Sequence, residues 1–152
     1  MLTHFSALLA DTELLKSHPS IDNTGVIPSV DMMLLGTGPD GHCGCIFPDS
    51  AEVKATGSGK VVLAGNDARA DGDFIAMSMD AMCAAKVVIV SAAGAGRAPM
   101  VAKALSGEFG AYDCPAGLVD AKEDTLWFTD EEGIAEFDMM EDEEDEEDEE
   151  DE

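Results

Sequence analysis

A length of 152 residues leaves room for one domain, and 33 acidic against 8 basic side chains give a formal net charge of −25. Residues 141–152 are all Asp or Glu, and the other 140 residues still carry a net charge of −13. Both parts repel phosphate backbones, which argues against nucleic-acid binding, and the longest weakly polar run, Val87–Gly96, is far shorter than the ~18–20 residues that cross a membrane.

Apolar spacing along the first half predicts a helix followed by short strands. Residues 3–16 have helical spacing, with Phe5, Leu8, Leu9 and Leu15 on one side. Val30–Leu35 is a nearly continuous apolar run that ends at a glycine, which is typical of a strand buried on both faces. Val61–Ala64 predicts a second strand, and residues 65–72 a loop.

The second half alternates strands and helices. A strand that includes Phe74 leads into a short helix near Cys83, and the later elements are a strand at Val87–Val90, a helix around Met100–Leu105, a strand at Leu126–Phe128 and a helix over residues 130–137. Strand, glycine turn, helix and strand in this order are typical of right-handed parallel crossovers. The predicted fold is therefore α/β, with a partial parallel, Rossmann-like sheet flanked by helices over residues 1–137.

The C-terminal residues 138–152 contain almost no apolar side chain that could be buried, and their charges repel one another. We expect a disordered acidic tail. The N-terminal residues lack a signal-peptide pattern, and the four cysteines are too few for a disulfide scaffold, so we expect reduced thiols and a cytoplasmic protein.

Three glycines and one histidine follow the apolar run that ends at Leu35. Gly36, Gly38 and Gly41 permit a tight turn, and His42 comes directly after it. The glycines also match the G-x-G-x-x-G dinucleotide fingerprint. Pro39 and Pro48 prevent the long helix that this fingerprint requires, so we predict no nucleotide cofactor. The tight spacing of His42 with the nearby cysteines is unlike a zinc site, so no metal is predicted.

The segment LLGTGPDGHCGCIFP, residues 34–48, resembles the signature of the 6-phosphogluconolactonases, which is close to LLGxGPDGHTASLFP. Residues 74–105 and 126–133 are similar to later parts of that family, which shares a superfamily with sugar-phosphate isomerases and glucosamine-6-phosphate deaminases. The resemblance implies hydrolysis of 6-phospho-D-glucono-1,5-lactone, a small sugar-phosphate lactone, to 6-phosphogluconate in the oxidative pentose phosphate pathway, without a cofactor.

The resemblance also implies roles for individual residues. His42 would be the general base, which suits an imidazole with an ordinary pKa of ~6.5. Asp40 would either orient that imidazole or cap the turn through its own backbone. Gly36, Gly38 and Gly41 would bring backbone N–H groups toward an oxyanion or a phosphate, and Arg97 stands where the family usually has a phosphate-binding lysine.

The chain also departs from the family pattern. It matches only the second half of the family's length, Cys43 and Cys45 replace the usual Thr and Ser, and Phe74 stands where an arginine is common. Activity could therefore be impaired by the absence of the N-terminal half. Two alternatives stay open: an isomerase or deaminase of the same superfamily, and an inactive half-domain whose acidic tail binds a basic protein partner.

Overall fold

The computed structural model describes residues 19, 21–22 and 24–150, with side chains up to residue 140. The helix predicted over residues 3–16 lies outside the described residues. Within the described part of the chain, no helix has the combination of length and apolar composition needed to cross a bilayer.

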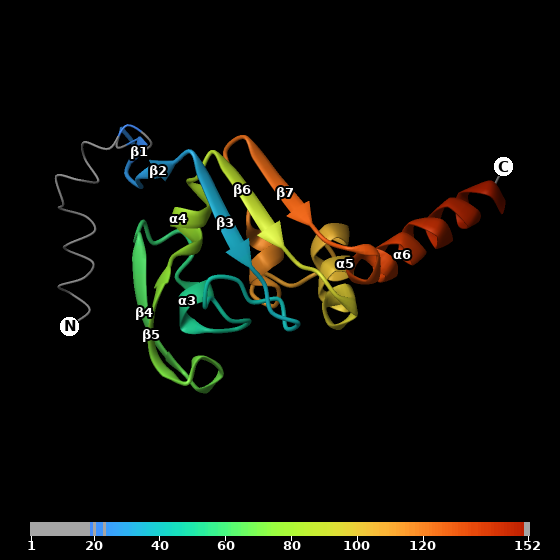
Figure 1. Cartoon of the computed structure of the whole chain (residues 1–152), viewed down its shortest axis with the longest axis horizontal. Coiled ribbons are helices and arrows are strands. Elements are labelled where there is room, and N and C mark those ends of the chain that lie inside the picture. The colour runs from blue at the N-terminus through green and yellow to red at the C-terminus, as the bar shows by residue number, and fades with distance from the viewer. Residues whose placement is uncertain (1–18, 20, 23, 151–152) are drawn as a thin grey trace.

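The centre of the molecule is a three-stranded parallel sheet (Figure 1). Its strands are β3 (Met32–Gly36), β6 (Val87–Ser91) and β7 (Asp124–Phe128), in the order β3-β6-β7. Both pairs are parallel and in register, so Leu34, Ile89 and Leu126 form a row across the sheet. The predicted α/β class with a parallel sheet is confirmed.

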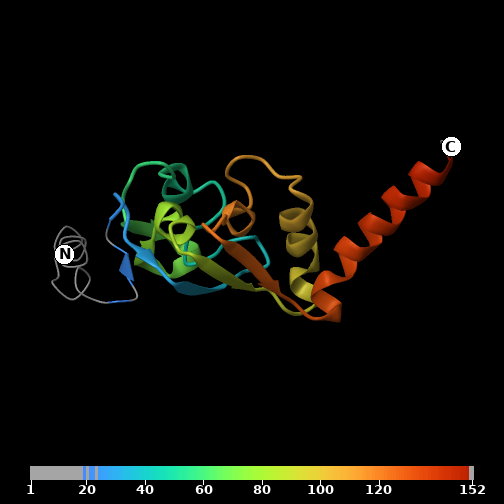
Figure 2. The ribbon, with the colours of Figure 1, turned by 90° about the horizontal axis from the view of Figure 1, so that it is seen from above.

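Helices cover one face of this sheet. α4 (Met79–Cys83) precedes β6, and α5 (Ala98–Ser106) connects β6 to β7. Figure 2 shows these helices on the same side of the strands. The side chains that point toward them, including Val88 and Val90 of β6, are fully buried, and together with Met82 and Val101 they form the core.

The other face of the sheet is open, contrary to the prediction for residues 30–35. Met33 and Leu35 of β3 are buried, whereas Met32 is 58% exposed and Leu34 is 73% exposed. Leu126 and Phe128 of β7 lie on the same face and are 45% and 60% exposed. The strand is therefore half-exposed, because among the described residues no element packs on this side (Figure 2).

A β-hairpin extends beside the sheet. β4 (Val62–Asp67) and β5 (Gly72–Met77) are antiparallel and are joined by the 3₁₀ turn η1 (Ala68–Ala70). The loop predicted over residues 65–72 is thus mostly strand and turn, because Gly65, Asn66 and Asp67 continue the ladder with β5. The sequence did not suggest α3 (Ala51–Lys54). Ser50 is its N-cap, and the Ser50 hydroxyl accepts a hydrogen bond from Val53 N.

Five further elements complete the fold. They are β1 (Ile21–Asp22), β2 (Ser29–Val30), η2 (Ala95–Arg97), η3 (Pro115–Leu118) and α6 (Glu131–Glu150). α6 begins where a helix was predicted, packs on α5 and extends away from the body toward the C-terminus (Figure 1). Disorder of residues 138–152 in solution stays a prediction, since their like charges oppose a helix.

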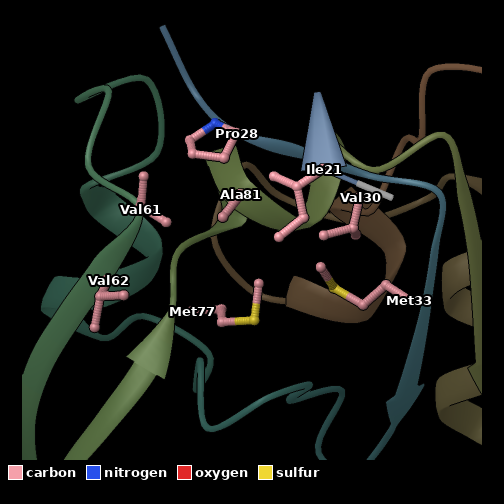
Figure 3. A pocket seen from close by; sticks show the side chains of 8 residues that line it. All are labelled: Ile21, Pro28, Val30, Met33, Val61, Val62, Met77 and Ala81. Carbon is pink, nitrogen blue, oxygen red and sulfur yellow. The ribbon is translucent and has the colours of Figure 1, made fainter. Parts of the chain in front are cut away.

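A cavity of about 210 Å³ lies at the start of β3, between β3, α4 and the β4–β5 hairpin (Figure 3). Eight side chains line it, and all are apolar, including Val30, Met33 and Ala81. None of the predicted site residues is among them. Because the lining has no polar side chain to orient a sugar phosphate, this cavity is separate from the candidate site.

Candidate active site

The predicted site lies at the carboxyl end of β3, where ligands bind in open α/β sheets. The chain leaves the strand at Gly36 and makes a turn in which Gly41 N donates to Gly38 O (3.0 Å) and Gly38 N donates to His42 O (3.0 Å). The hydroxyl of Thr37 donates to Ser91 O (3.0 Å), so the turn is fixed to the end of β6.

Two of the three predicted glycines are sterically required. A Cβ on Gly38 would lie 2.2 Å from Cε1 and 2.3 Å from Nδ1 of His42. Gly41 has a φ of 86°, which disfavours other residues, and a Cβ there would lie 3.1 Å from Cys114 Sγ. Gly36 ends β3, and a Cβ there would meet nothing within 4 Å. Since the N–H groups of Gly38 and Gly41 donate within the turn, these glycines make room for the histidine.

Asp40 and His42 form a hydrogen-bonded pair. His42 Nδ1 lies 2.7 Å from Asp40 Oδ1, and the same oxygen accepts from His42 N at 3.2 Å. The carboxylate therefore both orients the imidazole and caps the turn, which were the two alternatives for Asp40. The side chain of His42 is 33% exposed and that of Asp40 is 43% exposed, so solvent and small molecules reach the pair.

The hydrogen bond between the two side chains determines the tautomer of the imidazole. Partial burial alone would raise the pKa of Asp40, but hydrogen bonds from the side chain and backbone of His42 outweigh it and lower that pKa. An ionised carboxylate only accepts hydrogen bonds, so Nδ1 of the neutral imidazole carries the proton. Nε2 is then the basic nitrogen, which is the arrangement that a general base requires.

Arg97 reaches the same turn from the segment that follows β6. It lies in η2, just before α5, where its Nε donates to Thr37 O (3.0 Å) and its Nη1 donates to Ala93 O (3.0 Å). The structure therefore brings Arg97 together with the glycine turn that follows β3. These bonds hold the guanidinium at the carboxyl edge of the sheet and leave Nη2 without a partner among the described residues.

The two cysteines that replace hydroxyl residues differ in their surroundings. Cys43 is fully buried, and burial raises the pKa of its thiol to about 12, so it is not a nucleophile. Cys45 is exposed and has a φ of 63°.

Two side chains near the histidine were not indicated by the sequence: Phe47 lies next to it, and Arg69 lies against Phe47. The ring of Phe47 lies 4.7 Å from the imidazole of His42, centre to centre. The guanidinium carbon of Arg69, on η1, lies 4.6 Å from the centre of the Phe47 ring. Phe74 also packs against Phe47, edge to face at 6.1 Å. The only sequence signal for Arg69 is its position two residues after Asp67, with which it pairs.

A family model and the sequences of known proteins both match this chain, and they indicate the same family. Residues 6–127 match the family model described as glucosamine-6-phosphate isomerases/6-phosphogluconolactonase. The 6-phosphogluconolactonase of Streptomyces coelicolor is 35% identical over 109 residues, 72% of this chain and 41% of that protein. That of Mycobacterium leprae is 34% identical over 71% of this chain and 43% of its own length.

Solved structures of related proteins have a similar fold. The structure of 6-phosphogluconolactonase from Trypanosoma brucei superposes with a TM-score of 0.65 at 26% identity, covering 81% of this chain and 49% of that one. The chain thus spans less than half the length of the relatives named here. With a matching family model over most of its length and relatives above 30% identity, the chain belongs to the glucosamine-6-phosphate isomerase/6-phosphogluconolactonase family.

Proposed function

We propose that this chain carries the catalytic part of a 6-phosphogluconolactonase, which hydrolyses 6-phospho-D-glucono-1,5-lactone to 6-phosphogluconate in the oxidative pentose phosphate pathway. The observation that supports it is the Asp40–His42 pair at the carboxyl end of β3, with Nδ1 bound to a carboxylate and Nε2 left as the base. The names of the related proteins support the same substrate. We expect the reaction in the cytoplasm.

The proposed reaction begins with a water molecule that donates its proton to Nε2 of His42. The hydroxide adds to the lactone carbonyl carbon and forms a tetrahedral intermediate with a negative oxygen. When the bond between the carbonyl carbon and the ring oxygen breaks, His42 returns the proton to that oxygen. The products are the open hydroxyl and a carboxylic acid, which releases a proton to solvent. Asp40 stabilises the imidazolium between these steps.

Arg97 is the proposed binding residue for the phosphate group. Its guanidinium is held by Thr37 O and Ala93 O, so little side-chain entropy is lost when an anion binds to Nη2. We assign to Gly38 and Gly41 the role of letting the backbone approach the substrate. Gly36 has the role of ending β3 beside the substrate. The reaction as proposed uses no metal and no cofactor.

The test is hydrolysis of the lactone above its spontaneous rate, measured with this chain and with the same chain extended to its relatives' length. We expect His42→Gln to lower kcat by at least about a hundredfold, as for loss of a general base. Asp40→Asn should lower kcat less and shift the pH profile, because the amide cannot stabilise the imidazolium. A fully active His42→Gln variant would contradict the assignment of His42 as the general base. Lys60→Gln is the matched surface control.

A further inference from the structure

The imidazole of His42 has an aromatic neighbour in addition to its carboxylate partner. Asp40 Oδ1 lies 2.7 Å from Nδ1, and this single bond fixes one atom of the ring while the ring can still tilt about it. The centre of the Phe47 ring lies 4.7 Å from the imidazole centre, with 48° between the two planes. Ring pairs at such separations attract each other beyond the area that they bury. Phe47 therefore supplies a second contact, which restricts the tilt of the imidazole.

The Phe47 ring is itself held in place by the β4–β5 hairpin. The residue is only 4% exposed. Phe74, on β5, packs edge to face against it with ring centres 6.1 Å apart. The guanidinium carbon of Arg69, on the turn between the two strands, lies 4.6 Å from the centre of the Phe47 ring, within the range in which a cation is attracted to a ring face. Two side chains of the hairpin thus restrain the ring that contacts the histidine.

Hydrogen bonds of Arg69 tie the hairpin to the segment that carries Phe47. Nη1 donates to the carbonyl of Pro48, the next residue in the chain, at 3.3 Å. Nε and Nη2 donate to the two oxygens of Asp67 at 2.9 and 2.6 Å. These bonds lower the pKa of Asp67 to about 2, so both partners are charged at neutral pH. The guanidinium therefore contacts both the ring of Phe47 and the backbone beside it from a fixed position.

The hairpin also leaves space for the aromatic side chain that it contributes. Gly65 pairs with Phe74 across the two strands. A Cβ on Gly65 would lie 2.2 Å from Cζ of Phe74, so any other residue at position 65 would displace the Phe74 ring. The contact between Phe74 and Phe47 thus depends on a glycine in the facing strand.

We infer that Phe47 is a positioning residue for His42, and that the β4–β5 hairpin acts on the base through it. The inference rests on the proposed function for the role of His42. In it Phe47 touches neither the water nor the lactone. It keeps the imidazole plane, and with it the lone pair of Nε2, directed at the reacting water, and small misplacements of a reacting group cost large factors in rate. Binding of the phosphate at Arg97 does not depend on this stack.

The experiment combines kinetics with the NMR spectrum of the imidazole. We expect Phe47→Leu to lower kcat by about tenfold or more and to leave KM within about twofold, because a tilted base affects the chemical step alone. Imidazole ¹H–¹⁵N spectra distinguish a proton on Nδ1 from one on Nε2, and His42→Gln identifies the His42 signals among the three histidines. These signals should shift in Phe47→Leu from the Nδ1–H tautomer toward a mixture of both.

Two further variants separate the stack from general packing. Phe74→Leu removes the edge contact and leaves Phe47 in place, so it should lower kcat by about threefold and shift the same signals. Phe109→Leu is the matched control, because Phe109 is a partly buried ring that packs against the core beside Gly117. It should leave kcat and the His42 signals unchanged. A thermal unfolding scan checks that each variant is folded, and Phe74→Leu decides the outcome if Phe47→Leu is not.

Several results would overturn the inference. They are unchanged kcat in folded Phe47→Leu, a fall in kcat with unchanged His42 signals, a change in KM alone, and an equal fall in kcat in Phe109→Leu. If Phe74→Leu has to decide, unchanged kcat and signals would overturn it as well. If the wild-type chain does not hydrolyse the lactone, the proposed function fails, whereas the His42 signals of Phe47→Leu still show whether Phe47 holds the imidazole.

Discussion

Gly38 has no side chain at the place where the imidazole of His42 lies against the turn. Its Cβ position is 2.2 Å from Cε1 of the ring and 2.7 Å from Asp40 Oδ1, and Cβ atoms essentially never lie this close to other heavy atoms. The contact is with the same atoms that form the Asp40–His42 hydrogen bond. The glycine is therefore part of what positions the base.

Gly38→Ala should displace the imidazole and break its bond to Asp40. We expect the NMR resonance of His42 Cε1–H to shift and kcat to fall by about tenfold or more, because a misplaced base loses its alignment with the reacting water. Gly36→Ala is the matched control, since a Cβ there would meet nothing within 4 Å. An unchanged resonance together with an unchanged rate in Gly38→Ala would contradict this role.

The sequence revealed those site residues that belong to short local motifs. Asp40 and His42 belong to one motif on one turn, and Arg97 follows a glycine-containing turn after a clear strand, so short-range pattern was enough to find them. Phe47 lies in the same motif as His42, but the contact between the two rings depends on how the turn after β3 folds. Arg69 was missed because its contact with Phe47 is a tertiary contact between this segment and the β4–β5 hairpin. No period or spacing in the sequence encodes that contact.

At the level of elements, the sequence predicted most of the segments that form strands, but not that β4 and β5 pair outside the parallel sheet, nor which face of that sheet is covered. An apolar run such as Met32–Leu35 is typical of a strand between two layers of helices. Whether a second layer exists depends on other parts of the fold and not on the strand itself. In the described residues α4 and α5 cover one face, and Leu34 on the other face stays exposed.

Neighbouring leucines of β3 should therefore differ in their contribution to stability. Leu35 is 9% exposed and belongs to the core, so Leu35→Ala should lower the free energy of unfolding by about 2–5 kcal/mol. Leu34 is 73% exposed, and Leu34→Ala should lower it by less than about 0.5 kcal/mol. Denaturant unfolding followed by the fluorescence of Trp127 measures both. Equal losses would show that the second face is covered in solution.

Two properties of the whole molecule have opposite effects on self-association. The open face of the sheet presents Met32, Leu34, Leu126 and Phe128 to solvent, and apolar patches of this kind favour association. The net charge of −25, of which the last twelve residues supply nearly half, keeps copies of the chain apart. This repulsion is long-ranged at low ionic strength and is screened by salt, whereas the apolar contact is not.

Added salt should therefore promote self-association through the open face. Analytical ultracentrifugation should find a monomer at about 10 mM NaCl, where the screening length is about 30 Å, and a growing average mass toward 1 M, where it is about 3 Å. A chain that ends at residue 140, with a net charge of −13, should associate at lower salt because less repulsion has to be screened.

The double variant Leu34→Gln/Leu126→Gln should stay monomeric at all these salt concentrations, because it makes the centre of the open face polar. Val26→Gln is the control, since Val26 is 91% exposed but lies between β1 and β2, outside the three strands of the parallel sheet. Association that weakens as salt rises would mean that attraction between unlike charges drives it, and the acidic C-terminal residues would then be a binding segment. Association that strengthens with salt and is lost in the double variant identifies the sheet face as the contact and the acidic residues as the group that restrains it.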